Sequence, residues 1–213
     1  MSTKVLKLTR SKQLEFYEGR GLTKENSAFA VGWKNDHSQE VRFKKLCELF
    51  KNESGYFSIN DLGCGLGHFH DYIIANDYRN SGYVGYDVLD KMILEAKKIK
   101  RSGRSKFDVI GDAHDMKMAD YTVCSGIFNL KFDQPVEVWR KYISDTLDIM
   151  NEKSEKGFAF NALTSYSEED RKSDELYYSN PSKLFEYCLK NFSKNVSLLH
   201  DYHQYDFTIL VRK

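Results

Sequence analysis

The stretch SINDLGCGLGHFHDY, residues 58–72, constrains the fold of this chain more than any other. An apolar run ends at Asp61, glycines follow at every second position, and a helical pattern comes next. Glycines in such a turn let the backbone approach a ligand closely, and the following helix directs its N-terminus at that ligand. The stretch therefore predicts a strand, a ligand-binding loop and a helix. The glycines are Gly63, Gly65 and Gly67.

Strand and helix patterns alternate along the chain from this point. Strands are expected at 56–61, 82–87, 106–111, 121–128 and 157–163, and helices at 68–78, 90–101, 135–150 and 181–192. No convincing helix pattern separates the third of these strands from the fourth. The alternation implies a parallel sheet with helices on both faces.

The residues ahead of the first strand are expected to be helical. Phe16 and Tyr17 belong to a short apolar pattern, and apolar residues recur at helical spacing over residues 43–50. Asp36 and Ser38 are the candidates for the N-cap of this second helix. Both helices would form a cap ahead of the sheet.

The end of the chain breaks the alternation. Two strands are expected at 195–201 and 204–211, and the two residues between them cannot hold a crossover helix, so these strands must pair antiparallel. The predicted fold class is α/β: a doubly wound, Rossmann-like, seven-stranded, mostly parallel sheet with a terminal antiparallel hairpin and an N-terminal helical cap. We expect one domain over residues 1–213, with the cap at 1–52 and a cofactor-binding core at 53–213.

Charge and composition argue against several classes of partner. The chain has 32 Lys and Arg against 31 Asp and Glu, so no overall field attracts nucleic acid or a membrane surface. No stretch reaches the roughly 18 apolar residues of a spanning helix, and the N-terminus lacks the apolar run of a secretion signal. The scattered cysteines, without a C-x-x-C pair, indicate reduced thiols. We expect a cytoplasmic monomer or homodimer whose partner is a small molecule.

Two cofactors compete for the glycine loop. A dinucleotide site requires G-x-G-x-x-G, and His68 stands where the third glycine would be. Asp61 would also repel a pyrophosphate, whereas it would attract a cationic amine or sulfonium. The charge at the loop therefore favours S-adenosylmethionine over a nicotinamide dinucleotide.

From residue 56 to residue 213 the sequence resembles the class I S-adenosylmethionine-dependent methyltransferases. The loop DLGCGLG at 61–67 matches the D-x-G-x-G-x-G loop of that family, and the order of elements with the terminal hairpin also agrees. The resemblance implies methyl transfer from S-adenosylmethionine to an O, N or C atom of an acceptor, here a small molecule, by in-line displacement. We expect no metal, because the sequence contains no H-E-x-x-H motif and no C-x-x-C pair.

The resemblance also implies which residues bind the cofactor. Asp87 would accept both ribose hydroxyls, although a carboxylate at a strand end also caps the following helix. Asp112 would accept from the adenine amine, or would only form an Asx turn. Arg20 would reach the cofactor carboxylate, or would lie on the surface. The predicted cofactor set is Arg20, Asp61, Gly63, Cys64, Gly65, Asp87, Val88, Asp112, Ala113 and Ser125.

Fewer residues point to the acceptor. The catalytic candidates are His200, Asn129 and Tyr17; His200 would act as a base if the edge hairpin reaches the methyl group. The polar loop at 164–180 is long enough to be a lid or to be disordered. The predicted substrate-binding residues are Trp33, His37, Asn161 and Tyr166, and Trp33 has the alternative of packing against the cap.

Two other functions stay open. A tRNA or protein methyltransferase would use the basic run KKIKRSGRSK, residues 97–106, as a docking face, although a solvated helix end explains that run equally simply. The fourth strand ends in SGIFN, not in the [DN]-P-P-[YF] motif of family members that methylate amide or adenine nitrogens. A non-catalytic module would bind S-adenosylmethionine without releasing S-adenosylhomocysteine.

Overall fold

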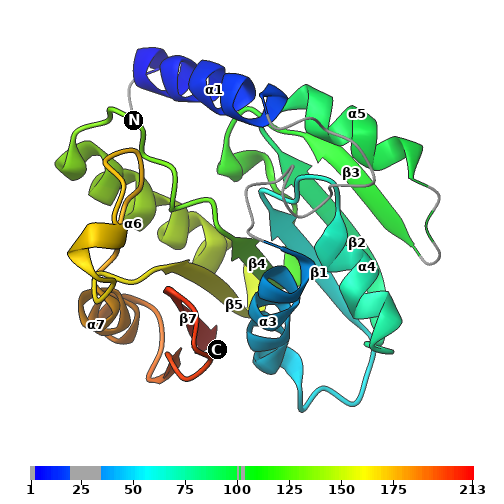
Figure 1. Cartoon of the computed structure of the whole chain (residues 1–213). Helices are drawn as coiled ribbons and strands as arrows, with labels where there is room; N and C mark the ends of the chain where they lie inside the picture. Colours follow the sequence, from blue (N-terminus) through cyan, green and yellow to red (C-terminus); the bar gives the residue numbers. More distant parts are fainter. Residues whose placement is uncertain (1–2, 20–34, 100, 102–103) are drawn as a thin grey trace.

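The computed structural model describes residues 3–19, 35–99, 101 and 104–213 (Figure 1). Arg20 and Trp33 lie outside these residues. Within the described chain, seven strands form one sheet in the order β3-β2-β1-β4-β5-β7-β6. The strands are β1 Phe57–Leu62, β2 Asn80–Asp87, β3 Ser105–Val109, β4 Ala119–Ser125, β5 Ser154–Leu163, β6 Asn195–Leu199 and β7 Asp206–Arg212.

The pairing of the strands confirms the predicted topology. Strands β1 to β5 pair in parallel, whereas β7 pairs antiparallel with both β5 and β6. The gap before β7 is longer than the predicted two residues, because β6 ends at Leu199 and β7 begins at Asp206. It still holds no crossover helix, and the two strands pair antiparallel as predicted. Strand β4 ends three residues earlier than expected, because Gly126 adopts a φ of 81° and turns the chain out of the sheet.

Helices cover both faces of the sheet, which confirms the doubly wound arrangement (Figure 1). Helices α3, α4 and α5 pack on one face, and α6 and α7 pack on the other. Helix α1 lies across the carboxyl ends of the strands. The helices are α1 Thr3–Glu18, α3 Asp36–Cys47, α4 His68–Ala75, α5 Asp90–Lys98, α6 Val136–Glu152 and α7 Pro181–Asn191, with short 3-10 helices η2 Glu48–Phe50, η3 Ala113–Asp115 and η4 Glu169–Arg171.

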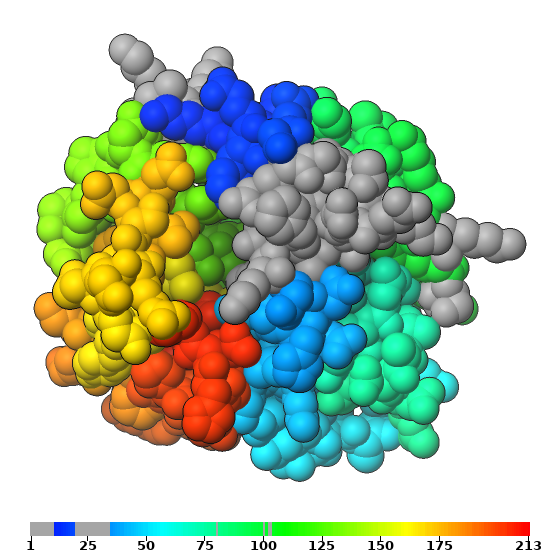
Figure 2. All heavy atoms as spheres, viewed as in Figure 1, coloured from blue at the N-terminus to red at the C-terminus, as the bar shows by residue number. Residues whose placement is uncertain are grey.

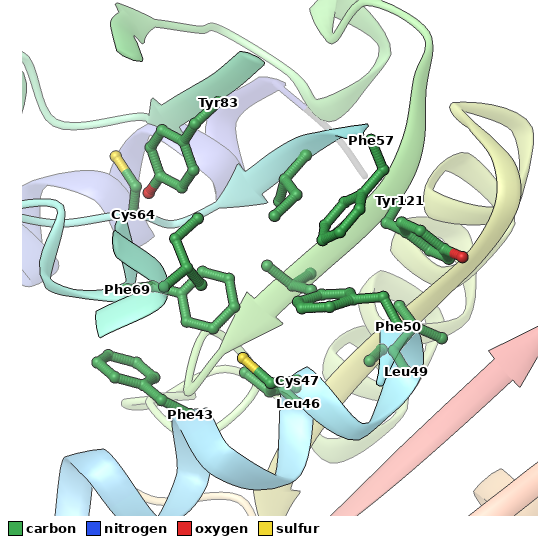
Figure 3. Close-up of a cluster of buried hydrophobic side chains, with 14 of the residues drawn as sticks. Phe43, Leu46, Cys47, Leu49, Phe50, Phe57, Cys64, Phe69, Tyr83 and Tyr121 are labelled. Carbon is green, nitrogen blue, oxygen red and sulfur yellow. The ribbon is translucent and has the colours of Figure 1, made fainter. Parts of the chain in front are cut away.

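Helix α3 packs against the sheet and contributes side chains to the hydrophobic core. Its residues Phe43, Leu46 and Cys47 are buried and point at the strands and at Phe69 of α4 (Figure 3). The expected caps Asp36 and Ser38 are wrong, because Asn35 begins the helix: its side-chain oxygen accepts the Ser38 N–H at 2.8 Å. Asn35, Asp36 and Ser38 can each cap a helix, and helical periodicity does not choose among them.

The segment at 164–180 is ordered and fastened at both ends. Ser165 N–H donates to the Ser179 carbonyl at 2.9 Å, and Ser179 N–H donates to the Leu163 carbonyl at 2.8 Å. Tyr177 N–H donates to the Asn129 carbonyl at 2.8 Å. These backbone bonds contradict the expectation of a disordered loop, because a disordered loop would not make them. The lid stays a prediction. No helix in the described parts of the chain is long and apolar enough to cross a membrane.

Candidate active site at the carboxyl edge of the sheet

A cavity of about 420 Å³ lies where β1, β2 and β4 end. Parallel sheets of this kind bind ligands at this edge, where the strand order reverses beside β1. Gln13, Phe16 and Tyr17 of helix α1 line the cavity, and Figure 2 shows this helix, in blue, at the surface of the molecule. Two ion pairs hold its C-terminal half. An ion pair of 2.9 Å joins Lys12 to Asp133, and another of 2.9 Å joins Glu18 to Lys91 of α5. Helix α1 and the segment at 164–180 thus supply walls of the cavity that the sheet lacks.

The glycine loop needs its glycines for two separate reasons. Gly63, Gly65 and Gly67 have φ values of 75°, 52° and 83°, which other residues rarely adopt. A Cβ on Gly63 would also lie 2.2 Å from Cγ2 of Ile127. The backbone N–H groups of Gly63 and Cys64 donate to the Tyr86 carbonyl, which ties the loop to β2. The loop therefore presents a bare backbone to the cavity.

Asp87 lines the cavity at the end of β2 and is 9% exposed. One carboxylate oxygen accepts the Gly65 N–H at 3.0 Å, and the other accepts the Leu89 N–H at 2.9 Å. Asp87 therefore holds the glycine loop and the start of α5 together.

Asp61 lines the same cavity and is 3% exposed. Burial raises the pKa of Asp61 to about 7; the hydrogen bond from the Tyr83 hydroxyl lowers it, and the negative charge of Asp87 raises it further. Two carboxylates thus share a poorly solvated cavity. A cation bound between them would stabilise the ionised form of Asp61.

Of the other predicted cofactor residues, Cys64, Val88 and Ser125 line the cavity, as do the catalytic candidates Asn129 and Tyr17. Asp112 and Ala113 are not among the described cavity-lining residues. Asp112 is exposed and accepts the His114 N–H at 2.9 Å, in a capping box with Asp115 that begins η3. Ala113 is half-buried against the core on the α6 side.

Asn161 supports the site from behind. It is fully buried in β5, where its Oδ1 accepts the Gly126 N–H at 2.9 Å and its Nδ2 donates to Ser125 Oγ at 3.0 Å. These two bonds hold the turn that ends β4. Asn161 is not among the described residues that line the cavity.

Three predicted residues lie on the surface and outside the described cavity lining: His37, Tyr166 and His200. His37 is exposed on α3. His200 follows β6, and its ring lies 6.0 Å from that of Tyr166 and 6.3 Å from that of Phe207. The antiparallel β7 separates β6 from the parallel strands, so the end of β6 stands away from the ends of β1 and β4.

Several cavity residues carried no recognisable sequence signal. Most come from α1, α3 and the segment at 164–180. In a helical sequence pattern, polar residues of this kind are normally expected on the solvated face. Gln39 Nε2 lies 3.3 Å from His68 Nδ1, and Arg42 forms a buried ion pair with Asp206. Among the described residues, no group of His, Cys, Asp and Glu lies where it could hold a metal ion. The unforeseen lining residues include Gln13, Phe16, Gln39, Arg42, Met92 and Leu176.

Arg101 fastens the glycine loop from outside the cavity. Its side chain is 4% exposed; Nε donates to Asp71 of α4 at 2.7 Å and Nη1 donates to the Ala96 carbonyl at 2.6 Å. Nη2 donates to the Leu66 carbonyl, and the guanidinium lies 4.8 Å from the Phe107 ring. One side chain therefore joins the loop, α4, α5 and β3.

The comparisons with known proteins agree with this geometry. No family model matches the sequence. A protein of Mycobacterium tuberculosis (strain ATCC 25618 / H37Rv), named Putative methyltransferase Rv1506c, is 46% identical over 162 residues, which cover 76% of this chain and 96% of that protein.

Solved structures of low identity share the fold. Magnesium protoporphyrin IX methyltransferase from Synechocystis PCC 6803, solved with bound SAH, has a TM-score of 0.63 and 15% identity over 96% of this chain and 94% of its own. Human N-acetylserotonin methyltransferase, solved with SAM, has a TM-score of 0.62 and 14% identity over 95% of this chain and 56% of its own. Together with the curated relative, these findings confirm the resemblance drawn from the glycine loop. The chain belongs to the class I S-adenosylmethionine-dependent methyltransferases.

Proposed function

We propose that this enzyme transfers the methyl group of S-adenosylmethionine to an O, N or C atom of a small-molecule acceptor by in-line displacement. The observation that carries the proposal is Asp87, a nearly buried carboxylate that lines the cavity and is held by two backbone N–H groups. A ribose offers two hydroxyl donors, and an ionised carboxylate accepts such a pair in charge-assisted hydrogen bonds.

The remaining cavity residues fit the cofactor by charge and by shape. Asp61 would attract the cationic sulfonium and amine groups, and the bare loop at Gly63 and Gly65 leaves room for the backbone to approach them. Cys64, Val88 and Ser125 would complete this part of the site. Asp112 and Ala113 at the adenine, and Arg20 at the carboxylate, stay part of the proposal.

The bound cofactor would supply an activated methyl group on a sulfonium, which is a good leaving group. The chain would contribute orientation and exclusion of water, which together account for much of the rate in such a displacement. Tyr17 and Asn129 line the cavity and would orient the acceptor. We assign no acceptor contact to His37, Tyr166 or His200, because all are exposed and outside the described cavity lining.

We also propose that residues 1–213 act as one unit, with 53–213 as the cofactor-binding core and 1–52 completing it. Helix α3 supports the sheet, and residues of α1 line the cavity. All four cysteines are buried free thiols. This supports the proposal that the enzyme acts in a reducing compartment such as the cytoplasm.

Calorimetric titration with S-adenosylmethionine, S-adenosylhomocysteine and NAD tests this function. We expect both sulfur ligands to bind in the micromolar range and NAD not to bind. With a substrate present, S-adenosylhomocysteine should accumulate in excess over the protein, which separates an enzyme from a module that only binds. Binding of NAD alone, or no binding of either sulfur ligand, would overturn the proposal.

A further inference from the structure

The side-chain NH₂ group of Asn129 has no hydrogen-bond acceptor among the described residues. Its Oδ1 accepts the Leu163 N–H at 3.0 Å, its backbone N–H donates to the Gly126 carbonyl at 3.2 Å, and its carbonyl accepts the Tyr177 N–H. Within the part of the chain that the structure describes, Nδ2 donates to no protein group. Because a backbone N–H can only donate, Leu163 fixes which end of the amide is oxygen. The free end is therefore an N–H donor.

This donor belongs to a side chain that lines the cavity. Asn129 as a whole is 7% exposed, so an amide donor here gains by finding a partner in a bound molecule. Asn161 offers a contrast on the neighbouring strand, because both ends of its amide are used by Gly126 and Ser125. The Leu163 N–H thus fixes the orientation of the Asn129 amide, while its Nδ2 has no partner among the described residues. An amide that recognises a ligand is expected to have both features.

The walls beside Asn129 are apolar. Leu130 pairs with Leu176 in an isolated β-bridge, and both line the cavity with Phe16 of α1 and Ile127. The ring of Phe16 lies 6.2 Å from that of Phe132, which places α1 against this end of the cavity. A molecule seated here would bury an apolar or aromatic body between these side chains.

The charges that line the cavity do not favour an anionic acceptor at this end. Among the described lining residues, the charged side chains are Arg42, Asp61, Asp87 and Glu175. Arg42 is already paired with buried Asp206, and Glu175 is exposed at the rim. Asp61 and Asp87 are assigned to the cofactor by the proposed function. None of the described lining residues therefore offers a free cation to compensate an acceptor carboxylate that becomes desolvated here.

We propose that Asn129 Nδ2 donates a hydrogen bond to an uncharged oxygen of the acceptor, and that the acceptor is a small aromatic or apolar molecule that carries such an oxygen. This inference rests on the proposed function and narrows its substrate class. Asn129 contributes orientation and selectivity: an amide N–H cannot take up a proton, so it holds the acceptor oxygen in place without acting as a base.

A pair of probes of one shape isolates this hydrogen bond. Acetophenone carries an oxygen that can only accept, and α-methylstyrene has a CH₂ group in its place. Titrated into protein saturated with S-adenosylhomocysteine, acetophenone should bind roughly five- to tenfold more tightly, the ratio expected for one net hydrogen bond. Equal binding of the two probes, or no binding of either, would contradict the proposal.

The variant Asn129→Asp tests which residue makes the bond. At pH 8 its carboxylate still accepts the Leu163 N–H but has no N–H of its own, so the preference for acetophenone should disappear. A probe with a hydroxyl donor, 4-methylphenol, should keep its affinity, because it can donate to the new carboxylate. Asn76→Asp, the same change at an exposed residue of the α4 C-terminus, should behave like the wild type.

Binding of S-adenosylhomocysteine separates the two proposals. If the wild type and Asn129→Asp both bind it but the acetophenone preference survives in the variant, the role of Asn129 is wrong and the proposed function stands. If the wild type does not bind it, the proposed function itself fails.

Discussion

Asp87 supports the glycine loop, and in the proposed function the same side chain also binds the ligand. Both oxygens accept backbone N–H groups, so replacement by Asn turns an amide N–H toward Gly65 or Leu89 and removes the charge. We expect Asp87→Asn to weaken S-adenosylhomocysteine binding about 10- to 100-fold, from the loss of charge-assisted hydrogen bonds. Calorimetry measures the change.

Asp90→Asn is the matched control for this variant. Asp90 is an exposed carboxylate three residues further on, in the first turn of α5, and it is not among the described cavity-lining residues. Its substitution should change the dissociation constant less than twofold. Equal effects of the two variants would show that Asp87 acts only through general charge.

Asp61 predicts a pH dependence of stability. Its pKa in the folded protein is about 7, whereas the usual value is 3.8, because burial disfavours the ionised form. The folded state therefore holds the proton more tightly, and the contribution of Asp61 to stability is lost as the pH rises from about 4 to about 7. Asp61→Asn removes this dependence.

We therefore expect the ligand-free Asp61→Asn protein to be more stable than the wild type at pH 8, by about 2–4 kcal/mol. The difference should shrink as the pH falls to 5, and cofactor binding should be weaker at both pH values. Urea denaturation at the two pH values measures it. A difference in unfolding free energy that does not change with pH would contradict the assignment.

At the scale of elements, Arg101 holds the glycine loop against its neighbours. Its contacts with Asp71, the Leu66 carbonyl and the Ala96 carbonyl leave the guanidinium almost completely buried. Arg101→Met keeps the length of the side chain and leaves these partners unsatisfied, so we expect a loss of about 2–4 kcal/mol in the free energy of unfolding. Binding of S-adenosylhomocysteine should weaken as well.

The exposed Arg104 offers the comparison for this prediction. Arg104→Met should leave both the unfolding free energy and the dissociation constant nearly unchanged. If Arg101→Met were as mild as Arg104→Met, the loop would owe its conformation to the glycines and to Asp87 alone.

The sequence predicted which elements exist more accurately than where they end. Alternating apolar runs and glycines identify strands and crossover helices, because these patterns follow from the period of each structure. The ends depend on local events: Asn35 caps α3, and Gly126 ends β4 with a positive φ. Such choices involve single hydrogen bonds or torsion angles, which periodicity does not encode.

Some residues of the candidate site could likewise be predicted from the sequence, and others could not. Residues in the glycine loop and at the strand ends, such as Asp61 and Asp87, were predictable because topology alone brings them to one edge. Gln39 and Arg42 reach the cavity only through the packing of α3 on the sheet. His200 was a candidate base only if the edge hairpin reaches the methyl group. In the structure β7 lies between β5 and β6, and His200 is exposed and outside the described cavity lining.

At the scale of the whole molecule, a buried ion pair joins helix α3, near the start of the chain, to strand β7, near its end. Arg42 of α3 pairs with Asp206 at the start of β7, and both side chains are nearly or fully buried. Removal of one partner leaves the other charge buried without compensation. We expect Asp206→Leu to cost about 3–5 kcal/mol of unfolding free energy, measured by urea denaturation.

The double variant, Arg42→Met with Asp206→Leu, should recover much of this loss, because no uncompensated charge stays in the core. The coupling energy from the double-mutant cycle should exceed about 1 kcal/mol. Additive effects of the two substitutions would mean that the pair contributes nothing beyond the packing of its side chains.

The whole arrangement places two carboxylates, a bare loop and a cross-lying helix around one cavity. A crystal structure of the protein with S-adenosylhomocysteine tests this most directly. We expect the nucleoside in the cavity, with both ribose hydroxyls within hydrogen-bond distance of the Asp87 carboxylate. A nucleoside bound elsewhere, or an Asp87 that contacts only backbone in the complex, would contradict it.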